Sequence, residues 1–220
     1  MNRKLNPRKG AGRRDPNVGL MAQMALLTAI MLILAFTPLG YIPLPFMNAT
    51  TMHIPVIIGG CLLGPAAGAA LGGFFGVTSV IKATIQPNIT SFVFTPFYSF
   101  SPQFHGSPAS LVVAIVPRIL IGLAAGFLYR ALKTRMKEKN APLFICGFAG
   151  SMVNTIGVMS LICLFFGEQY ALAGGKDPSL VIQLILGIIA INGIPEAIIG
   201  AILTQAVGRA LLVVIKNTSR

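Results

Sequence analysis

The chain of 220 residues is 55% hydrophobic and only 10% charged, with a mean hydropathy of +0.80. Soluble domains carry about 25% charged residues, so this composition indicates an integral membrane protein that has the lipid bilayer as its solvent. The formal net charge of +12 does not indicate a nucleic-acid partner, because the basic residues lie in short flanks between apolar runs.

The chain begins with a basic segment, residues 1–19, in which six Lys or Arg residues lie between Arg3 and Arg14. The apolar run Leu20–Phe36 follows, and no small-residue cleavage site after it resembles that of a signal peptide. We therefore expect a retained first span. Three alanines in this run, Ala22, Ala25 and Ala29, are small residues at helical spacing, which would form a docking face for another membrane subunit if they are exposed.

The next apolar region, His53–Ile81, is interrupted by the string LLGPAAG. It is either one long kinked helix or two shorter helices joined at Gly64 and Pro65, since proline lacks the backbone donor that a continuous helix needs. Glycines recur every four residues across this region, a spacing that lets helix backbones approach closely in a membrane. They are Gly60, Gly64, Gly68, Gly72 and Gly76.

Three further apolar segments reach the length of a span, about 17–20 residues. They are Ala109–Arg130, Pro142–Phe166 and Leu180–Val214. If His53–Ile81 forms two helices, the basic first segment, the five Lys or Arg residues of 130–139 and the C-terminus all lie on one side, as the positive-inside rule requires. We therefore predict an all-α six-helix transmembrane bundle over residues 20–214, with cytoplasmic tails at 1–19 and 215–220.

The connection Lys82–Pro108 is rich in proline and contains six aromatic residues. One interpretation is a lid over a pocket on the outer side. The other is an interfacial loop that its aromatic side chains anchor in the membrane surface.

The predicted spans contain a few polar side chains, and two of these carry charge. Arg118 follows Pro117 in the fourth span, and Glu196 follows Pro195 in the sixth, with Asn192 one helical turn before it. An intramembrane charge costs at least about 2.5–3.5 kcal/mol, so both charges should face the interior of the bundle. The two prolines also free the carbonyls of Val113 and Ile191 for a ligand or a neighbouring group.

Two interpretations of the charges remain open. Arg118 and Glu196 form a buried ion pair that fixes helix register, or the planar guanidinium of Arg118 binds an anionic solute while Glu196 and Asn192 orient polar groups deeper in the cavity. Asn154, about midway along the fifth span, and His53, which opens the second, are further polar candidates.

Enzymatic chemistry has few candidate groups here. The chain has five acidic residues and two histidines, and it contains no HExxH, GxSxG or Walker-type GxxxxGK[ST] motif. The three cysteines lack CxxC spacing, so we predict neither a disulfide nor a metal site. Uphill transport would therefore need an energising partner. The alternative is a secondary transporter of a small anionic solute that uses Glu196 for proton coupling.

Together these features resemble the substrate-binding membrane subunits, called S components, of energy-coupling factor (ECF) vitamin transporters. The resemblance covers nearly all of the chain after residue 19. It rests on the alanine pair of the first span and on HIPVIIGGCLLGPAAGAALGGFFGVTS from His53, TSFVFTPF from Thr90, VPRILIG from Val116 and NGIPEAI from Asn192. Among the vitamin branches, the chain looks most like the pantothenate subunits.

The resemblance implies a non-enzymatic importer subunit in the bacterial plasma membrane that needs no cofactor. Such a subunit captures its vitamin outside and docks through first-helix alanines onto a membrane coupling subunit carried by two ATPases. Pantothenate has one carboxylate, for which Arg118 is the natural partner, while Asn192, Glu196 and Asn154 suit its hydroxyl and amide groups. The weaker candidates are Thr51 and His53, and His53 has an alternative role as a cap or interfacial anchor of its helix.

Overall fold

The structure, a computed structural model, describes residues 16–43, 48–136 and 141–218. Most of the predicted basic N-terminal tail, residues 1–15, therefore lies outside the described residues. The helices are α1 (Pro16–Phe36), α2 (His53–Leu63), α3 (Pro65–Ile85), α4 (Pro108–Arg135), α5 (Ala141–Ala173), α6 (Val181–Ile188) and α7 (Ile194–Thr218). Single turns of other helix types are η1 (Ser91–Val93), η2 (Pro178–Leu180) and η3 (Ile189–Gly193). Two antiparallel hairpins pair β1 (Tyr41–Pro43) with β2 (Asn48–Thr50) and β3 (Ser99–Ser101) with β4 (Phe104–His105).

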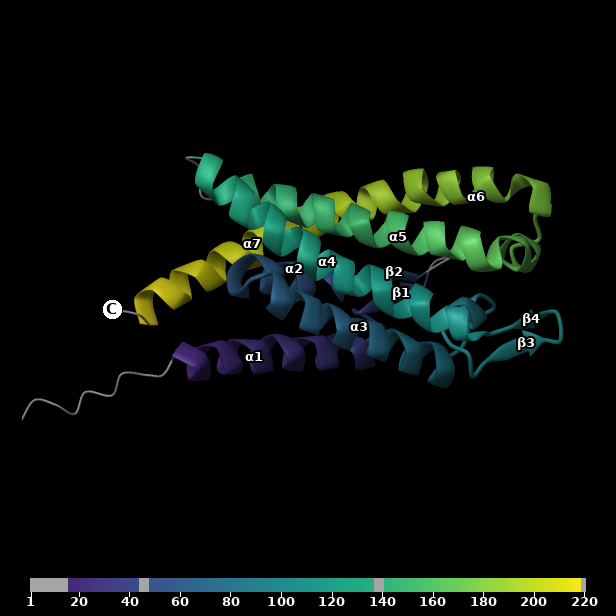
Figure 1. Cartoon of the computed structure of the whole chain (residues 1–220), viewed down its shortest axis with the longest axis horizontal. Coiled ribbons are helices and arrows are strands. Elements are labelled where there is room, and N and C mark those ends of the chain that lie inside the picture. The colour runs from purple at the N-terminus through teal and green to yellow at the C-terminus, as the bar shows by residue number, and fades with distance from the viewer. Residues whose placement is uncertain (1–15, 44–47, 137–140, 219–220) are drawn as a thin grey trace, which may run out of the picture.

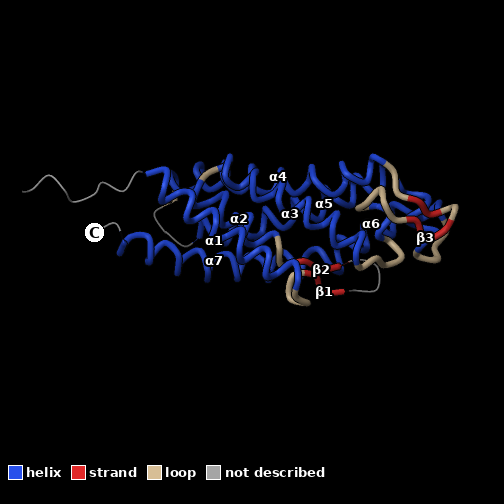
Figure 2. Tube along the Cα trace, turned by 90° about the horizontal axis from the view of Figure 1, so that it is seen from below, coloured by secondary structure: helices blue, strands red, loops and turns tan. Residues whose placement is uncertain are grey.

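The helices lie side by side in one elongated bundle (Figures 1 and 2). The start of α1 and the end of α7 are at the same end of this bundle, and the β3–β4 hairpin projects from the opposite end, here termed the hairpin end. Within the described residues, five helical segments are long and apolar enough to cross a membrane, the last of them running through η2, α6, η3 and α7. The predicted six-helix membrane bundle is confirmed.

The sixth helix of the bundle, α2, is only 11 residues long. At 1.5 Å per residue it spans roughly 16 Å, about half of a bilayer's hydrocarbon core. It ends at Leu63, its C-cap residue Gly64 has φ 105°, and Pro65 occupies the first position of α3. This φ favours glycine, and proline is tolerated at a helix start because its missing N–H would have no helical partner there. The two-helix interpretation of residues 53–81 is therefore confirmed, with a half-length first member.

The connection between α1 and α2 takes up part of the space that the short helix leaves. Figure 2 shows its hairpin β1–β2 at the edge of the bundle, part-way along its length. Thr51 ties its two ends together, since its backbone N–H donates to the Gly40 carbonyl at 3.3 Å and its hydroxyl donates to the Leu39 carbonyl at 2.7 Å. This connection therefore forms part of the wall of the bundle.

Helices α3 and α4 pack backbone to backbone through glycines. A Cβ atom added at Gly68 would lie 2.7 Å from the Gly122 carbonyl oxygen, and one at Gly76 would lie 2.9 Å from the Cα of Ile115. Real Cβ contacts are longer than this, so only glycine fits. The close packing predicted from the four-residue spacing is confirmed for α3. Gly64 instead forms the turn between α2 and α3.

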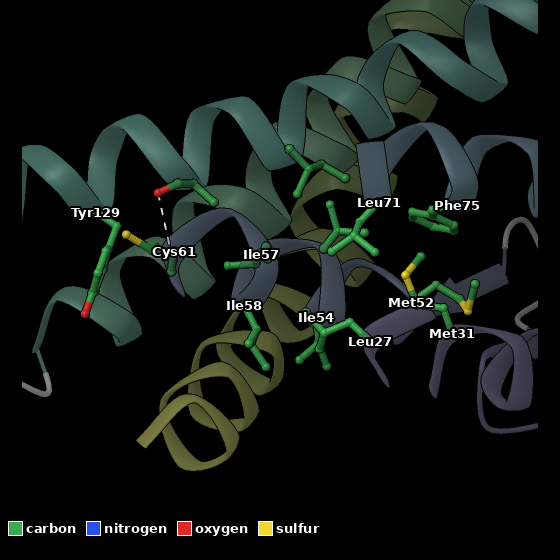
Figure 3. Packing of buried hydrophobic residues seen from close by; sticks show 14 of the residues in the cluster. Leu27, Met31, Met52, Ile54, Ile57, Ile58, Cys61, Leu71, Phe75 and Tyr129 are labelled. Carbon is green, nitrogen blue, oxygen red and sulfur yellow. Dashed lines mark hydrogen bonds between the residues drawn. The ribbon is translucent and has the colours of Figure 1, made fainter. Parts of the chain in front are cut away.

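Two clusters of buried side chains stabilise the bundle. The first joins α1, α2 and α3 to α4 and α5, and it includes Met31, Met52 and Phe75 (Figure 3). The second lies toward the hairpin end, where Phe92 from η1 meets Phe166 of α5 edge-on, with ring centroids 6.0 Å apart. Because Tyr170 and Ala171 are also buried, α5 continues to Ala173, seven residues beyond its predicted end.

The glycine interface makes a paired prediction at two adjacent positions of α3. A Cβ at Gly72 would overlap the Arg118 carbonyl, whereas the nearest atom to a Cβ at Gly73 is Ile119 Cγ1 at 3.9 Å. We expect Gly72→Ala to cost about 1–3 kcal/mol of unfolding free energy by overpacking. The control Gly73→Ala gains the same helix propensity without the clash. Thermal unfolding of the purified protein in detergent checks this, and equal midpoints for the two variants would contradict the packing.

Candidate functional site

The bundle contains a cavity of about 420 Å³, within the range of roughly 300–1,000 Å³ typical of small-molecule sites. Its walls come from the end of α1, the last two turns of α3, the connection that follows α3, and the middle of α5. Thr50 of β2, Arg118 of α4 and Glu196 of α7 complete the lining. Apolar side chains of α5, including Val158, Met159 and Ile162, form one side. The cavity therefore combines an apolar surface with a few polar groups, as expected for a binding site.

Arg118 is held at this cavity by three neighbours, although it is only 5% exposed. Its Nη1 donates to the Val113 carbonyl at 2.8 Å, and its Cζ lies 5.3 Å from the ring centroids of both Phe75 and Phe94. Because Pro117 has no N–H, the carbonyl of Val113 lacks its usual helical donor, and the guanidinium replaces it. The two rings add cation–π attraction. The side chain thus has a fixed position at the cavity wall.

Glu196 lines the same cavity, and its contacts are with His53 and Thr50. The Thr50 backbone N–H donates to Glu196 Oε1 at 3.1 Å, and His53 Nδ1 lies 3.7 Å from the same oxygen. The carboxylate thereby fastens the β1–β2 hairpin and the start of α2 to α7. The contact between Glu196 and His53 is an ion pair only when the imidazole is protonated.

Asn154 of α5 also lies at the cavity and is 5% exposed. Its Oδ1 atom accepts no hydrogen bond from the described part of the chain. A buried amide oxygen without a donor costs free energy, which a ligand hydroxyl or N–H would recover. The structure therefore brings Arg118, Glu196 and Asn154 to one cavity.

The other three predicted residues, Asn192, Thr51 and His53, line a second, smaller cavity of about 210 Å³. Glu196 and Thr50 belong to both cavities and separate them. Asn192 lies in the π-helical turn η3, whose i→i+5 bonding is shown by the Ile194 N–H that donates to the Ile189 carbonyl. This turn changes the angular offset between Asn192 and Glu196 from that of an α-helix. The two residues therefore do not share the larger cavity.

His53 is 1% exposed and is the first residue of α2, but no side-chain hydrogen bond caps this helix. A Cβ added at Gly200 of α7 would lie 2.9 Å from His53 Nε2, so the ring is packed against that helix. The structure thus shows no side-chain cap from His53 for this helix. His53 is an interior residue at the wall between the two cavities.

The aromatic residues of the α3–α4 connection divide into two groups. Phe92 is fully buried and Phe94 contacts Arg118, while Phe97 and Phe100 are 76% and 52% exposed. The connection is fastened at both ends, by the Thr84 and Thr95 hydroxyls 2.7 Å apart and by the Ser110 hydroxyl that donates to the Phe92 carbonyl at 2.7 Å. Its first half is thus a wall of the cavity, and its second half presents aromatic side chains outward.

Sequence reasoning missed several residues of the cavity. Ser79 and Lys82 of α3 and Tyr170 of α5 all line it. The sequence held a signal for the α3 residues, because the spacing of Phe75, Ser79, Lys82 and Gln86 places them on one face of a helix. Tyr170 lay in a segment that was predicted to be a loop.

The predicted docking alanines Ala22, Ala25 and Ala29 are all exposed on α1. Only 17% of the membrane-length window of α1 is buried, compared with 33–44% for the other four spans. Figure 1 shows α1 along one side of the bundle. The helix therefore presents most of its surface to whatever surrounds the protein.

Comparison with known proteins gives a family and two relatives. Residues 20–208 match the model of the family described as ECF transporter, substrate-specific component. The chain is 37% identical over 194 residues to the pantothenic acid transporter PanT of Lactococcus lactis subsp. cremoris (strain MG1363). The aligned region covers 87% of this chain and 92% of the relative. It is 31% identical over 196 residues to the pantothenate transporter PanT of Leuconostoc mesenteroides subsp. mesenteroides, which covers 84% of this chain and 87% of that relative.

The family match spans most of the chain, both relatives are bacterial transporters, and five segments reach membrane length. With its half-length α2 and its cavity among α3, α4, α5 and α7, this multi-pass membrane protein belongs to the family of substrate-specific components of ECF transporters.

Proposed function

We propose that this chain captures pantothenate for an ECF-type importer and that Arg118 binds the carboxylate of the vitamin. The observation that carries the proposal is the guanidinium of Arg118, held by Val113, Phe75 and Phe94 at the wall of a cavity of about 420 Å³. A planar guanidinium matches a carboxylate in geometry and charge. Both relatives carry names that specify pantothenate.

The rest of the cavity suits the remainder of this ligand. Asn154 Oδ1 can accept from a ligand hydroxyl or amide N–H, and the Glu196 carboxylate can accept from a hydroxyl. The apolar wall of Val158, Met159 and Ile162 suits the methyl-bearing carbons of the pantoyl group. In this proposal the ligand lies on one side of Glu196, and Asn192, Thr51 and His53 lie on the other side, in the second cavity.

The orientation and the partners follow from the same proposal. The hairpin end faces outward, so the cavity fills from outside, and the tails 1–19 and 215–220 are cytoplasmic. The basic residues of α4 near Arg135 then lie on the inner side, consistent with the positive-inside rule. The chain performs no chemistry on its cargo. A membrane coupling subunit with two ATPases supplies the energy, and it docks on the exposed alanine face of α1.

Calorimetry on the purified protein tests capture and the role of Arg118 together. Wild type should bind pantothenate tightly and bind panthenol, in which a hydroxymethyl group replaces the carboxylate, more weakly. Arg118→Gln should raise the Kd for pantothenate at least about 30-fold, since the loss of a buried charged partner costs about 2–5 kcal/mol. It should change the Kd for panthenol little.

Two controls keep this test interpretable. Arg118→Lys retains the charge without the planar fork and should recover only part of the affinity. Thermal unfolding without ligand reports whether Arg118→Gln is folded. An equal loss of affinity for both ligands in a folded variant would show that Arg118 does not hold the carboxylate.

The docking face makes a separate prediction. Ala25→Phe and Ala29→Phe should leave the Kd for pantothenate unchanged, because both residues are exposed on α1 and neither lines the cavity. Uptake into proteoliposomes that contain the coupling module should fall at least about tenfold, because a bulky side chain prevents close helix approach. Ala206→Phe, at an exposed position of α7, is the matched control. Undiminished uptake by both α1 variants would exclude this docking face.

Glu196→Gln tests the secondary-transport alternative. The amide oxygen can still accept from the Thr50 N–H, so the wall between the cavities should persist. We expect uptake to stay within a few-fold of wild type, because a coupling module rather than a proton drives it. Intact pantothenate binding with abolished uptake would instead favour obligatory proton transfer at Glu196.

A further inference from the structure

One face of α3 connects the interior of the bundle to the hairpin end. Phe75, Ser79, Lys82 and Gln86 follow one another along it at helical spacing. Their exposure rises in the same order, from 0% for Phe75 and 5% for Ser79 to half-buried for Lys82 and exposed for Gln86. Phe75 contacts the guanidinium of Arg118, and the other three line the cavity. Lys82 therefore lies nearer the mouth of the cavity than Arg118, roughly two turns or 10 Å along α3 from Phe75.

The Cα–Cβ bonds of Lys82 and Arg118 are inclined toward each other along the axis of the bundle. Cα–Cβ bonds tilt toward the N-terminus of a helix. Figure 1 shows that α3 runs toward the hairpin end and α4 runs away from it, so the Cα–Cβ bond of Lys82 tilts away from that end and the Cα–Cβ bond of Arg118 tilts toward it. The bond from Arg118 to the Val113 carbonyl, five residues earlier in α4, shows this direction directly.

The charge of the cavity is unbalanced. Among the described lining residues the ionisable side chains are Lys82, Arg118, Glu196 and Tyr170. With Glu196 ionised, this lining still carries a net charge of +1. Glu196 contacts Thr50 and His53 at the wall of the second cavity. An anion at the mouth therefore meets an excess of positive charge, and Lys82 is its nearest cation.

We propose that Lys82 is the capture residue of this site: its ammonium group attracts the carboxylate of the incoming ligand at the mouth and passes it to the guanidinium of Arg118. This inference rests on the proposed function and assigns the two cations different tasks. Lys82 carries a compact ammonium on a half-buried side chain, whereas Arg118 is 5% exposed and presents a planar guanidinium deeper in the bundle. Lys82 therefore governs the association rate, and Arg118 governs the dissociation rate.

Stopped-flow kinetics of ligand binding to the full-length protein in detergent tests this division. Lys82→Gln should lower kon for pantothenate about three- to tenfold at low ionic strength and flatten its dependence on salt. It should change koff by less than about twofold and leave both rates for panthenol unchanged. Arg118→Lys should instead raise koff for pantothenate. Lys82→Arg, which keeps the charge, should restore most of kon.

The matched control is Lys176→Gln. Lys176 is an exposed lysine beyond the end of α5, at the same end of the bundle, and it does not line the cavity. If Lys82→Gln and Lys176→Gln lower kon equally, general attraction by net charge explains the effect and the proposal is wrong. An unchanged kon for Lys82→Gln would also overturn it, as would a koff that rises as much as kon falls or an equal loss of kon for panthenol.

Wild-type binding separates this inference from the function on which it rests. If wild type binds no pantothenate, the proposed function and the role of Lys82 fail together. If wild type binds and only the Lys82 results depart from expectation, capture by Lys82 fails alone.

Discussion

The site depends on one guanidinium that is stabilised inside an apolar bundle. An intramembrane arginine is costly unless its donors find partners. Here Pro117, next in sequence, deprives the Val113 carbonyl of its helical donor, and Arg118 itself supplies a replacement at 2.8 Å. The same proline that weakens α4 thus creates the acceptor that positions the charge. Phe75 can stack on this group only because α3 and α4 approach through glycines.

The cavity exists because one helix of the bundle is incomplete. Helix α2 ends at Leu63 after 11 residues, and the α1–α2 connection occupies part of the remaining length. A loop can line a site where a straight apolar helix would fill it with side chains. The connection is fastened to α7 by the Thr50 N–H bond to Glu196. The described part of this connection is thus held by the two hydrogen bonds of Thr51 and by the bond from Thr50 to Glu196.

The sequence predicted features with local causes and missed features that depend on packing. The break at Gly64 and Pro65 was predictable, because a glycine–proline pair interrupts a helix whatever surrounds it. The interior position of Arg118 was predictable from the cost of a charge in lipid. That Lys82 lines the cavity was not predictable, because the spacing gives the helix face that it shares with Phe75 and Ser79 but not what that face packs against. The separation of Asn192 from the larger cavity was missed because the extra residue of a π-turn leaves no mark in a run of apolar letters.

The turn Ile189–Gly193 also makes the geometry of the site sensitive to the number of residues that the turn contains. Successive residues of an α-helix are about 100° apart around its axis. A helix with one residue fewer in this turn would rotate everything C-terminal to it by about that angle, and Glu196 would leave the wall that it shares with Thr50 and His53. Single-residue deletions here would therefore alter the site as strongly as replacement of its charged groups.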